Sequence, residues 1–215
     1  EIYVAPGNAG TAQIALNLEI NPGDIEGLAK VAQDKAIELV VVGPEVPLAE
    51  GVVDYFQTKG IPIFGPTRKA AQIEASKVFA KELMQKYGIP CARSITFSDY
   101  GQAKEYIKQQ TPPVVIKADG LAAGKGVIIA DSTTLALEAL ASIMESKTLG
   151  AAGDKVIIEE YLSGNEMSSF AFTDSRTVVP MVDACDYKRI YDGDHGPNTG
   201  GMGSYSPPHF FNPML

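Results

Sequence analysis

Cysteine is scarce in this chain of 215 residues, which contains only Cys91 and Cys185, far apart in the sequence. Two isolated cysteines cannot form a disulfide framework, and they lack the close spacing of paired zinc ligands. Scarce cysteine of this kind fits a reducing compartment, so we expect a cytoplasmic protein.

Long apolar runs and positive charge are also lacking. No apolar stretch approaches the roughly 20 residues that cross a bilayer, and the first residues lack the basic and apolar segments of a signal peptide. The 18 basic residues are outnumbered by 26 acidic ones, which gives a net charge of −8. Because an acidic chain repels a phosphate backbone, we expect no nucleic acid as a partner. The lack of a bilayer-spanning run leads us to expect no membrane as a partner either.

Both ends of the sequence lack the features of a complete chain. The first residue is Glu1 rather than methionine, and it leads directly into the strand-like run Ile2-Tyr3-Val4. The last residues stop at Leu215 without a terminal element. We therefore expect an internal piece of a longer protein.

Residues 1–75 alternate strand and helix signals. Strands are expected at 2–5, 39–42 and 61–64, and helices begin after Asp24 and at Pro47. The run at 39–42 is apolar throughout, as in a parallel strand that is buried on both faces. This alternation predicts an α/β domain with a Rossmann-like open parallel sheet.

Residues 76–215 predict a second domain of α+β character. Ser76 can cap a helix that buries Phe79, Leu83 and Tyr87 and that ends at Gly88. Further helices are expected at 99–109 and 135–144. Strands are expected at 94–97, 114–118, 127–130, 156–162, 167–173 and 178–184.

The segment 117–127, Lys-Ala-Asp-Gly-Leu-Ala-Ala-Gly-Lys-Gly-Val, is rich in glycine and carries two lysines. Glycine lets backbone N–H groups approach phosphate oxygens, and lysine supplies positive charge. The segment is not a Walker A loop, because Gly126 and a strand follow Lys125 where that motif needs Ser or Thr and a helix. It is either a hairpin whose tip could fold over a triphosphate or an ordinary hairpin with solvated lysines.

Lys117 ends an otherwise apolar strand, where it is well placed to hold a phosphate oxygen. Lysine is rarely buried without a partner. The alternative is an edge lysine whose stem lies on apolar surface while its ammonium reaches water.

A second strand, around residues 156–162, ends in the acids Glu159 and Glu160 before Leu162. Such a strand end could form an adenine slot, with Glu166 accepting the ribose hydroxyls. Paired acids at the end of a strand are also common as simple solvated groups.

The third segment carries Lys188 and Arg189 and then five glycines between residues 193 and 203. So many glycines are typical of a flexible linker. The functional alternative is a substrate loop that presents backbone amides to a carboxylate or a phosphate.

Together, in this order, these segments resemble the glycinamide ribonucleotide synthetase family of the ATP-grasp superfamily. The resemblance covers nearly the whole chain, and its most specific string is Gly-Pro-Asn-Thr-Gly-Gly-Met-Gly at 196–203. The other matching strings lie at 3–11, 41–45, 64–66, 75–77, 117–127 and 159–162. The implied fold is a Rossmann-like pre-ATP-grasp domain followed by part of an ATP-grasp domain.

The resemblance implies two sets of binding residues. The ATP-binding residues would be Lys77, Lys117, Gly120, Gly124, Lys125, Gly126, Glu159, Glu160, Leu162 and Glu166. The residues for glycine and 5-phosphoribosylamine would be Asn8, Glu45, Lys188, Arg189, Asp194, Asn198, Thr199, Gly200 and Gly201.

The chain departs from the family in a few places. Tyr187 stands where the family usually has histidine, which puts that histidine's role in doubt, and His195 receives no catalytic role. The family's first strand is expected before Glu1. The ligands for Mg²⁺ (or Mn²⁺) are expected beyond Leu215, so no metal ligand is expected within this chain.

The implied activity is the ATP-dependent ligation of glycine to 5-phosphoribosylamine through glycyl phosphate, a step of purine biosynthesis. The enzyme would be a monomer or part of a multifunctional purine enzyme. The alternatives are another ATP-grasp carboxylate–amine ligase, or an inactive nucleotide-binding module if the chain exists alone.

Overall fold

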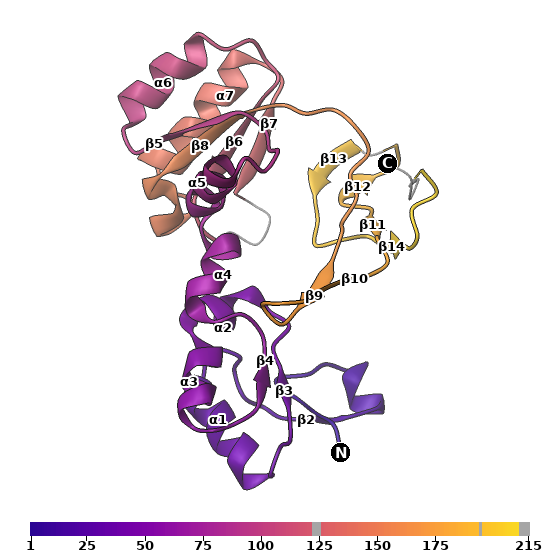
Figure 1. Ribbon diagram of the computed structural model, residues 1–215. Coiled ribbons are helices and arrows are strands. Elements are labelled where there is room, and N and C mark those ends of the chain that lie inside the picture. The colour runs from indigo at the N-terminus through magenta and orange to yellow at the C-terminus, as the bar shows by residue number, and fades with distance from the viewer. Residues whose placement is uncertain (122–125, 194, 211–215) are drawn as a thin grey trace. The chain divides into compact units, whose positions relative to one another are not determined.

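The structure is a computed structural model that describes residues 1–121, 126–193 and 195–210. The chain divides into two compact units. The first unit contains residues 1–91 and 119–121, and the second contains residues 92–118 and the remainder of the chain. Figure 1 shows the elements of both units along the chain.

The first unit contains two pairs of parallel strands and a set of short helices. Strand β1 (Tyr3–Val4) pairs with β2 (Leu16–Asn17), and β3 (Val40–Val41) pairs with β4 (Ile63–Phe64). The helices are η1 (Thr11–Gln13), α1 (Ile25–Asp34), α2 (Glu45–Glu50), α3 (Val52–Thr58), α4 (Arg68–Ala75) and α5 (Lys77–Tyr87). The core forms where α1 and α3 meet, around the buried residues Ala29, Ala32, Val53 and Phe56.

The expectation that strand 39–42 is buried on both faces is wrong. Val40 and Val42 pack against the core of the first unit. Leu39 and Val41, which point the other way, are 57% and 66% exposed. Successive side chains of a strand alternate between faces, and within the described residues only one face of this pair of strands is packed on a core.

The helix expected from Pro47 onward is two helices rather than one. Gly51 separates α2 from α3 and has φ of 95°. This left-handed conformation ends a helix readily in glycine because glycine has no Cβ to clash. The chain therefore turns at Gly51 between the two helices.

Helix α5 begins and ends where the sequence predicted, but it buries other residues. The Ser76 side chain accepts a hydrogen bond from the Phe79 N–H, and Gly88 ends the helix with φ of 65°. The buried residues are Val78 and Ala80, while Phe79 and Tyr87 are exposed. Of the expected stripe, only Leu83 is half-buried, so the packed side of the helix is formed mainly by other residues.

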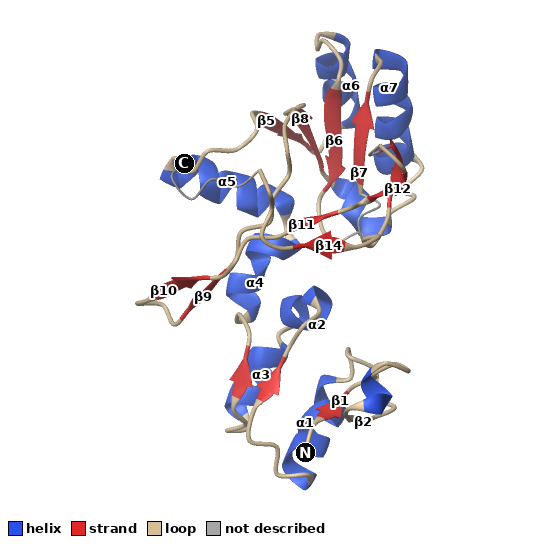
Figure 2. Cartoon of the chain, turned by 90° about the vertical axis from the view of Figure 1, so that its right-hand side faces the viewer, coloured by secondary structure: helices blue, strands red, loops and turns tan. Residues whose placement is uncertain are grey.

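The second unit contains a four-stranded antiparallel sheet in the order β5-β8-β6-β7. These strands are Ser94–Phe97 (β5), Val114–Ala118 (β6), Val127–Ala130 (β7) and Val156–Glu160 (β8). Helices α6 (Tyr100–Lys108) and α7 (Thr133–Leu140) lie beside the sheet in Figure 2 and share its core. A π turn (Ala141–Glu145) and a 3-10 turn (Gly150–Asp154) lead from α7 to β8.

The described residues after β8 form three short antiparallel ladders. Strand β9 (Ala171–Thr173) pairs with β10 (Val178–Pro180), β11 (Cys185–Asp186) pairs with β14 (Ser204–Tyr205), and β12 (Arg189–Tyr191) pairs with β13 (His195–Asn198). Strands β9 and β10 are shorter than the expected strands 167–173 and 178–184. Among the helices that the structure describes, none has the length and apolar character to cross a membrane.

Candidate functional site

Lys117 lies at the end of β6 and makes an ion pair with a buried carboxylate. Its Nζ lies 2.7 Å from Glu159 Oε2, and the Glu159 side chain is only 4% exposed. In the register of β6 and β8, Lys117 faces Ile157 and Val115 faces Glu159, so Lys117 and Glu159 are diagonal neighbours on one face of the sheet. A buried carboxylate needs a compensating cation. Lys117 is therefore an anchored lysine rather than a freely solvated one.

Glu160, the next residue of β8, is held by an arginine that the sequence analysis did not single out. Arg93 Nε and Nη2 lie 2.7 Å and 2.6 Å from Glu160 Oε2, and the backbone N–H of Arg93 donates to Glu160 Oε1 at 2.8 Å. The Glu160 N–H donates to the Arg93 carbonyl. Leu162 follows the strand and is exposed. The adenine slot proposed for Glu159, Glu160 and Leu162 stays a prediction.

The start of the glycine-rich loop is tied to the beginning of α5 within the first unit. Lys77 Nζ donates a hydrogen bond to the Gly120 carbonyl oxygen at 2.7 Å. The carboxylate of Asp119 accepts hydrogen bonds from Ser76 Oγ and from the Val78 N–H. Gly124 and Lys125 lie outside the described residues. Gly126 is buried, and its carbonyl accepts a hydrogen bond from the Ala118 N–H at 2.9 Å.

Glu166 and Lys188 were expected to contact different ligands, but the structure brings them together. Lys188 Nζ lies 3.1 Å from Glu166 Oε1 and 3.9 Å from Asp186 Oδ2. The hydrogen bond with Glu166 is the main reason why the pKa of Lys188 is raised. Lys188 therefore stays protonated at neutral pH, and its charge is shared with acids of the protein.

The glycine-rich segment after Arg189 is a hydrogen-bonded hairpin in its described part rather than an open linker. Arg189 Nη1 donates a hydrogen bond to the Gly196 carbonyl at 2.7 Å. Asn198 pairs with Arg189 across β12 and β13. The Thr199 N–H and Oγ1 both donate to the Lys188 carbonyl.

Gly201 continues this hairpin, since its N–H donates to Thr199 Oγ1 at 3.0 Å. Gly201 has φ of 115°, a conformation that few residues other than glycine adopt. Gly200 is exposed, and Asp194 lies outside the described residues.

The two residues of the first unit that were expected to bind 5-phosphoribosylamine, Asn8 and Glu45, are not brought together by any described contact. Asn8 is used locally: its Oδ1 accepts hydrogen bonds from the N–H groups of Gly10 and Thr11, which closes the turn before η1. Glu45 is the exposed first residue of α2. Their proposed contacts with 5-phosphoribosylamine stay predictions.

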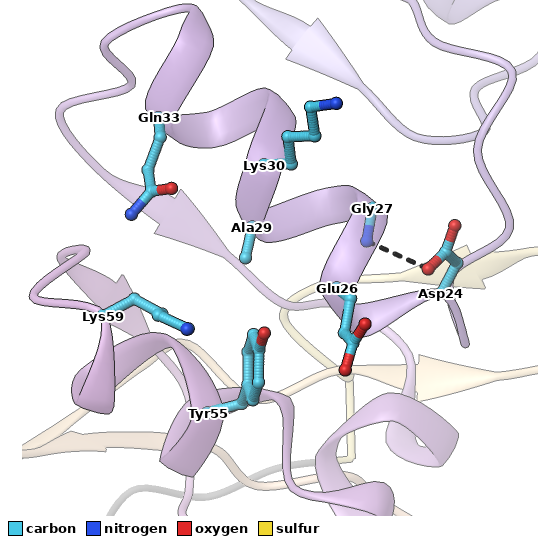
Figure 3. A pocket seen from close by; sticks show the side chains of 8 residues that line it. All are labelled: Asp24, Glu26, Gly27, Ala29, Lys30, Gln33, Tyr55 and Lys59. Atoms are coloured by element: carbon cyan, nitrogen blue, oxygen red, sulfur yellow. Dashed lines mark hydrogen bonds between the residues drawn. The ribbon is translucent and has the colours of Figure 1, made fainter.

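A shallow hollow between α1 and α3 contains none of the expected site residues. Figure 3 shows its lining, in which Asp24 caps α1 through the Gly27 N–H while Lys30, Tyr55 and Lys59 project around the hollow. Its mixed charges give no pattern that selects one class of ligand. Among the described residues, no group of three or more histidine, cysteine, aspartate and glutamate side chains could hold a metal ion.

Comparison with known proteins places the chain in a family. Residues 1–74 match the phosphoribosylglycinamide synthetase N domain, and residues 75–215 match the phosphoribosylglycinamide synthetase ATP-grasp (A) domain. Phosphoribosylamine–glycine ligases of Halalkalibacterium halodurans and Vibrio vulnificus are 48% and 50% identical to the whole chain. The chain spans about half the length of these curated relatives, at 50% of each.

Solved structures agree with this assignment. The phosphoribosylamine–glycine ligase of Thermotoga maritima matches 95% of this chain and 49% of its own, with a TM-score of 0.76 and 38% identity. A biotin carboxylase-beta-gamma-ATP complex from Campylobacter jejuni matches 87% of this chain and 45% of its own, with a TM-score of 0.69 and 19% identity, which is a likeness of fold alone. The chain therefore belongs to the phosphoribosylglycinamide synthetase family.

Proposed function

We propose that the protein containing this chain ligates glycine to 5-phosphoribosylamine at the expense of ATP, giving glycinamide ribonucleotide, ADP and phosphate. The similarity of the whole chain to named phosphoribosylamine–glycine ligases supports the reaction. The structural observation that supports ATP binding is the position of Lys117. This lysine is held by a buried carboxylate, and it lies at the end of the strand that leads into the glycine-rich loop.

The reaction requires the protein to neutralise charge and to position the reactants. The carboxylate of glycine is a poor electrophile until it is phosphorylated, and the amine of phosphoribosylamine then displaces phosphate from glycyl phosphate. Such transfers are accelerated by holding the reactants in line and by balancing charge. Lys77 and Lys117 would each donate to phosphate oxygens, and no nucleophilic side chain is required.

The remaining assignments follow the family resemblance and the local geometry. The backbone at Glu160 and Leu162 would line the adenine slot, and Glu166 would accept the ribose hydroxyls. Lys188, Arg189 and the hairpin residues Asn198, Thr199, Gly200 and Gly201 would bind the smaller substrates. Their hydrogen bonds give the hairpin a defined backbone, which supports a binding role.

A divalent metal ion enters the proposal only because reactions of ATP require one. Mg²⁺ or Mn²⁺ would offset the charge of the triphosphate. The described residues do not provide a cluster of ligands that fits such an ion. We therefore assign no residue of this chain to the metal and derive no step through it.

The domain functions are proposed in the same way. Residues 1–75 would form a Rossmann-like substrate domain, supported by the parallel pairing of β1 with β2 and of β3 with β4. Residues 76–215 would belong to the ATP-grasp domain. We further propose a cytoplasmic enzyme that acts as a monomer or as part of a multifunctional purine enzyme.

The decisive experiment measures ADP release by the purified full-length protein. We expect release only when ATP, glycine and freshly generated phosphoribosylamine are all present, and we expect glycinamide ribonucleotide as the product. ADP release that continues with a different acid in place of glycine, or with a different amine, would instead support another carboxylate–amine ligase.

A further inference from the structure

Asp119 follows the last residue of β6, and its side chain reaches back to a helix that begins more than forty positions earlier in the sequence. Its Oδ1 and Oδ2 atoms lie 3.1 Å and 3.3 Å from Ser76 Oγ, and Oδ1 accepts a hydrogen bond from the Val78 N–H at 3.2 Å. All of these residues lie in the first unit. No pattern in the sequence points to a role for Asp119.

The hydrogen bonds at the start of α5 form a connected set. The first N–H groups of a helix have no partner within the helix. Ser76 Oγ accepts from the Phe79 N–H at 3.1 Å and donates to Asp119, while Asp119 itself accepts from the Val78 N–H. Helix α5 is therefore capped by two residues, one of which comes from the glycine-rich loop.

This arrangement decides which group occupies the positive end of α5. The N-terminus of a helix attracts anions, including phosphate. Here the carboxylate of Asp119 already occupies that position, so a phosphate there would have to displace it. The Val78 and Phe79 N–H groups at the start of α5 thus bind Asp119 and Ser76 rather than a phosphate.

Gly120, the residue after Asp119, is also held at the start of α5. Lys77 is the first residue of α5, and its Nζ donates to the carbonyl oxygen of Gly120 at 2.7 Å. Gly120 has φ of 103°, so the chain turns sharply directly after Asp119. The start of α5 therefore holds Asp119 through its side chain and Gly120 through its backbone carbonyl.

We propose that Asp119 is a positioning residue for ATP binding. By capping α5 it fixes the start of the glycine-rich loop, and with it the position of the Lys77 ammonium at Gly120. The proposal rests on the proposed function, because it takes Lys77 to contact the phosphates of ATP. The role of Asp119 is indirect, since it acts on the nucleotide through Lys77 and Gly120.

The competing explanation is that Asp119 merely stabilises a helix. Asp24 provides a matched control, because its Oδ1 caps α1 by accepting from the Gly27 N–H at 2.9 Å, as Figure 3 shows. Both residues are aspartates that cap helices of the first unit. Only Asp119 lies at the start of the glycine-rich loop.

The test compares Asp119→Ala, Asp119→Asn and Asp24→Ala in the full-length protein by calorimetry with ATP and by steady-state kinetics. We expect Asp119→Ala to raise the Kd and the KM for ATP about tenfold, which corresponds to about 1.4 kcal/mol. The KM for glycine should not change. Asp119→Asn keeps an acceptor oxygen for Ser76 and Val78, so its Kd for ATP should stay within about threefold of the wild type. Asp24→Ala should leave the Kd for ATP unchanged.

Two outcomes would overturn the proposal. If Asp119→Ala weakens ATP binding no more than Asp24→Ala does, Asp119 is only a helix cap. If Asp119→Asn weakens ATP binding as much as Asp119→Ala does, the hydrogen bonds of Asp119 with Ser76 and Val78 do not position the loop. Failure of the proposed function looks different, because the wild type itself would then either not bind ATP or bind it without releasing ADP in a glycine-dependent reaction.

Amide hydrogen exchange without nucleotide tests the structural part separately. Val78 should exchange faster in Asp119→Ala and should be unaffected in Asp24→Ala. If the exchange rate of the Val78 N–H is unchanged in Asp119→Ala, this N–H is not protected by Asp119 and the proposal loses its structural basis.

Discussion

At the scale of single residues, the ion pair between Lys117 and Glu159 links folding and proposed ATP binding. The Lys117 side chain is 27% exposed, whereas that of Glu159 is nearly buried. The carboxylate therefore needs the lysine for its own burial, and the lysine gains a fixed position at the strand end. A substitution of Lys117 alone changes both stability and binding, so the two effects have to be separated.

The first prediction separates them with a pair of neutral replacements. Lys117→Met should lower the free energy of unfolding by about 3 kcal/mol, because it removes the ammonium that lies 2.7 Å from the buried Glu159 carboxylate. Adding Glu159→Gln should restore most of that stability. In both variants the Kd for ATP should rise at least tenfold, since a charge-assisted hydrogen bond contributes about 1.5–3 kcal/mol. Urea unfolding and calorimetry measure the two quantities.

A control comes from an ion pair on α6. Lys108 Nζ lies 2.7 Å from Glu105 Oε1, and both side chains are largely exposed. Lys108→Met should change stability by less than about 1 kcal/mol and leave ATP binding unaltered. Normal ATP affinity in the Lys117→Met/Glu159→Gln double variant would restrict Lys117 to a structural role.

At the scale of elements, Gly51 determines that α2 and α3 are separate helices. Its φ of 95° lies in the left-handed region, and an added Cβ would lie 3.4 Å from the side chain of Arg68. We predict that Gly51→Ala lowers the free energy of unfolding by about 1–2 kcal/mol, mainly through backbone strain. Urea unfolding monitored by circular dichroism measures the change.

Gly43→Ala is the matched control for this prediction. No positive φ is found at Gly43, and an added Cβ would meet no atom within 4 Å. Its stability should therefore differ from the wild type by less than about 0.5 kcal/mol. Equal effects of the two substitutions would show that the left-handed conformation of Gly51 is not what matters.

A second prediction for elements concerns the ladder of β11 and β14, where Cys185 faces Tyr205. The hydrogen bond with Cys185 is the main cause that raises the pKa of Tyr205 from 10.0 to about 12. Because the neutral phenol is the form favoured by folding, its stabilising contribution is complete below pH 10 and is lost as the pH rises through about 12.

Spectrophotometric titration of the tyrosines should therefore show one late phenol that is absent from Tyr205→Phe. In Cys185→Ala the same phenol should titrate nearer to the ordinary value of 10.0. A late phenol that persists in both variants would belong to another tyrosine. Tyr187, whose ring centroid lies 5.5 Å from that of Tyr205, is the neighbour to examine in that case.

At the scale of the whole molecule, ATP binding should appear as protection against unfolding. A ligand that binds only the folded protein adds about 2.7 kcal/mol at a concentration one hundred times its Kd. We predict that ATP raises the melting temperature of the full-length protein, and that AMP at the same concentration raises it less because it lacks the phosphates that the lysines would hold.

Lys117→Met/Glu159→Gln provides the control for this measurement. Its stability without ligand should be close to that of the wild type, while its ATP-dependent shift should be much smaller. Equal protection by ATP and AMP in the wild type would mean that the adenosine part, rather than the phosphates, accounts for the binding energy.

The sequence by itself determined the local features of the chain and its family. Asp24, Ser76 and Asp99 each cap a helix through an N–H three residues later, and such contacts depend only on neighbouring residues. Strands β6 and β7 also lie where the apolar runs predicted them. The family followed from short strings in a fixed order, which the comparisons confirmed.

Only the tertiary structure decided which distant residues meet. Lys117 with Glu159, Glu160 with Arg93, and Asp119 with Ser76 join positions about forty or more residues apart, so no local pattern specifies them. The burial of Val78 instead of Phe79 and the exposure of Val41 were likewise set by the surfaces that pack against each element. Sequence spacing fixes which side chains share a face, but long-range packing selects the face that is buried.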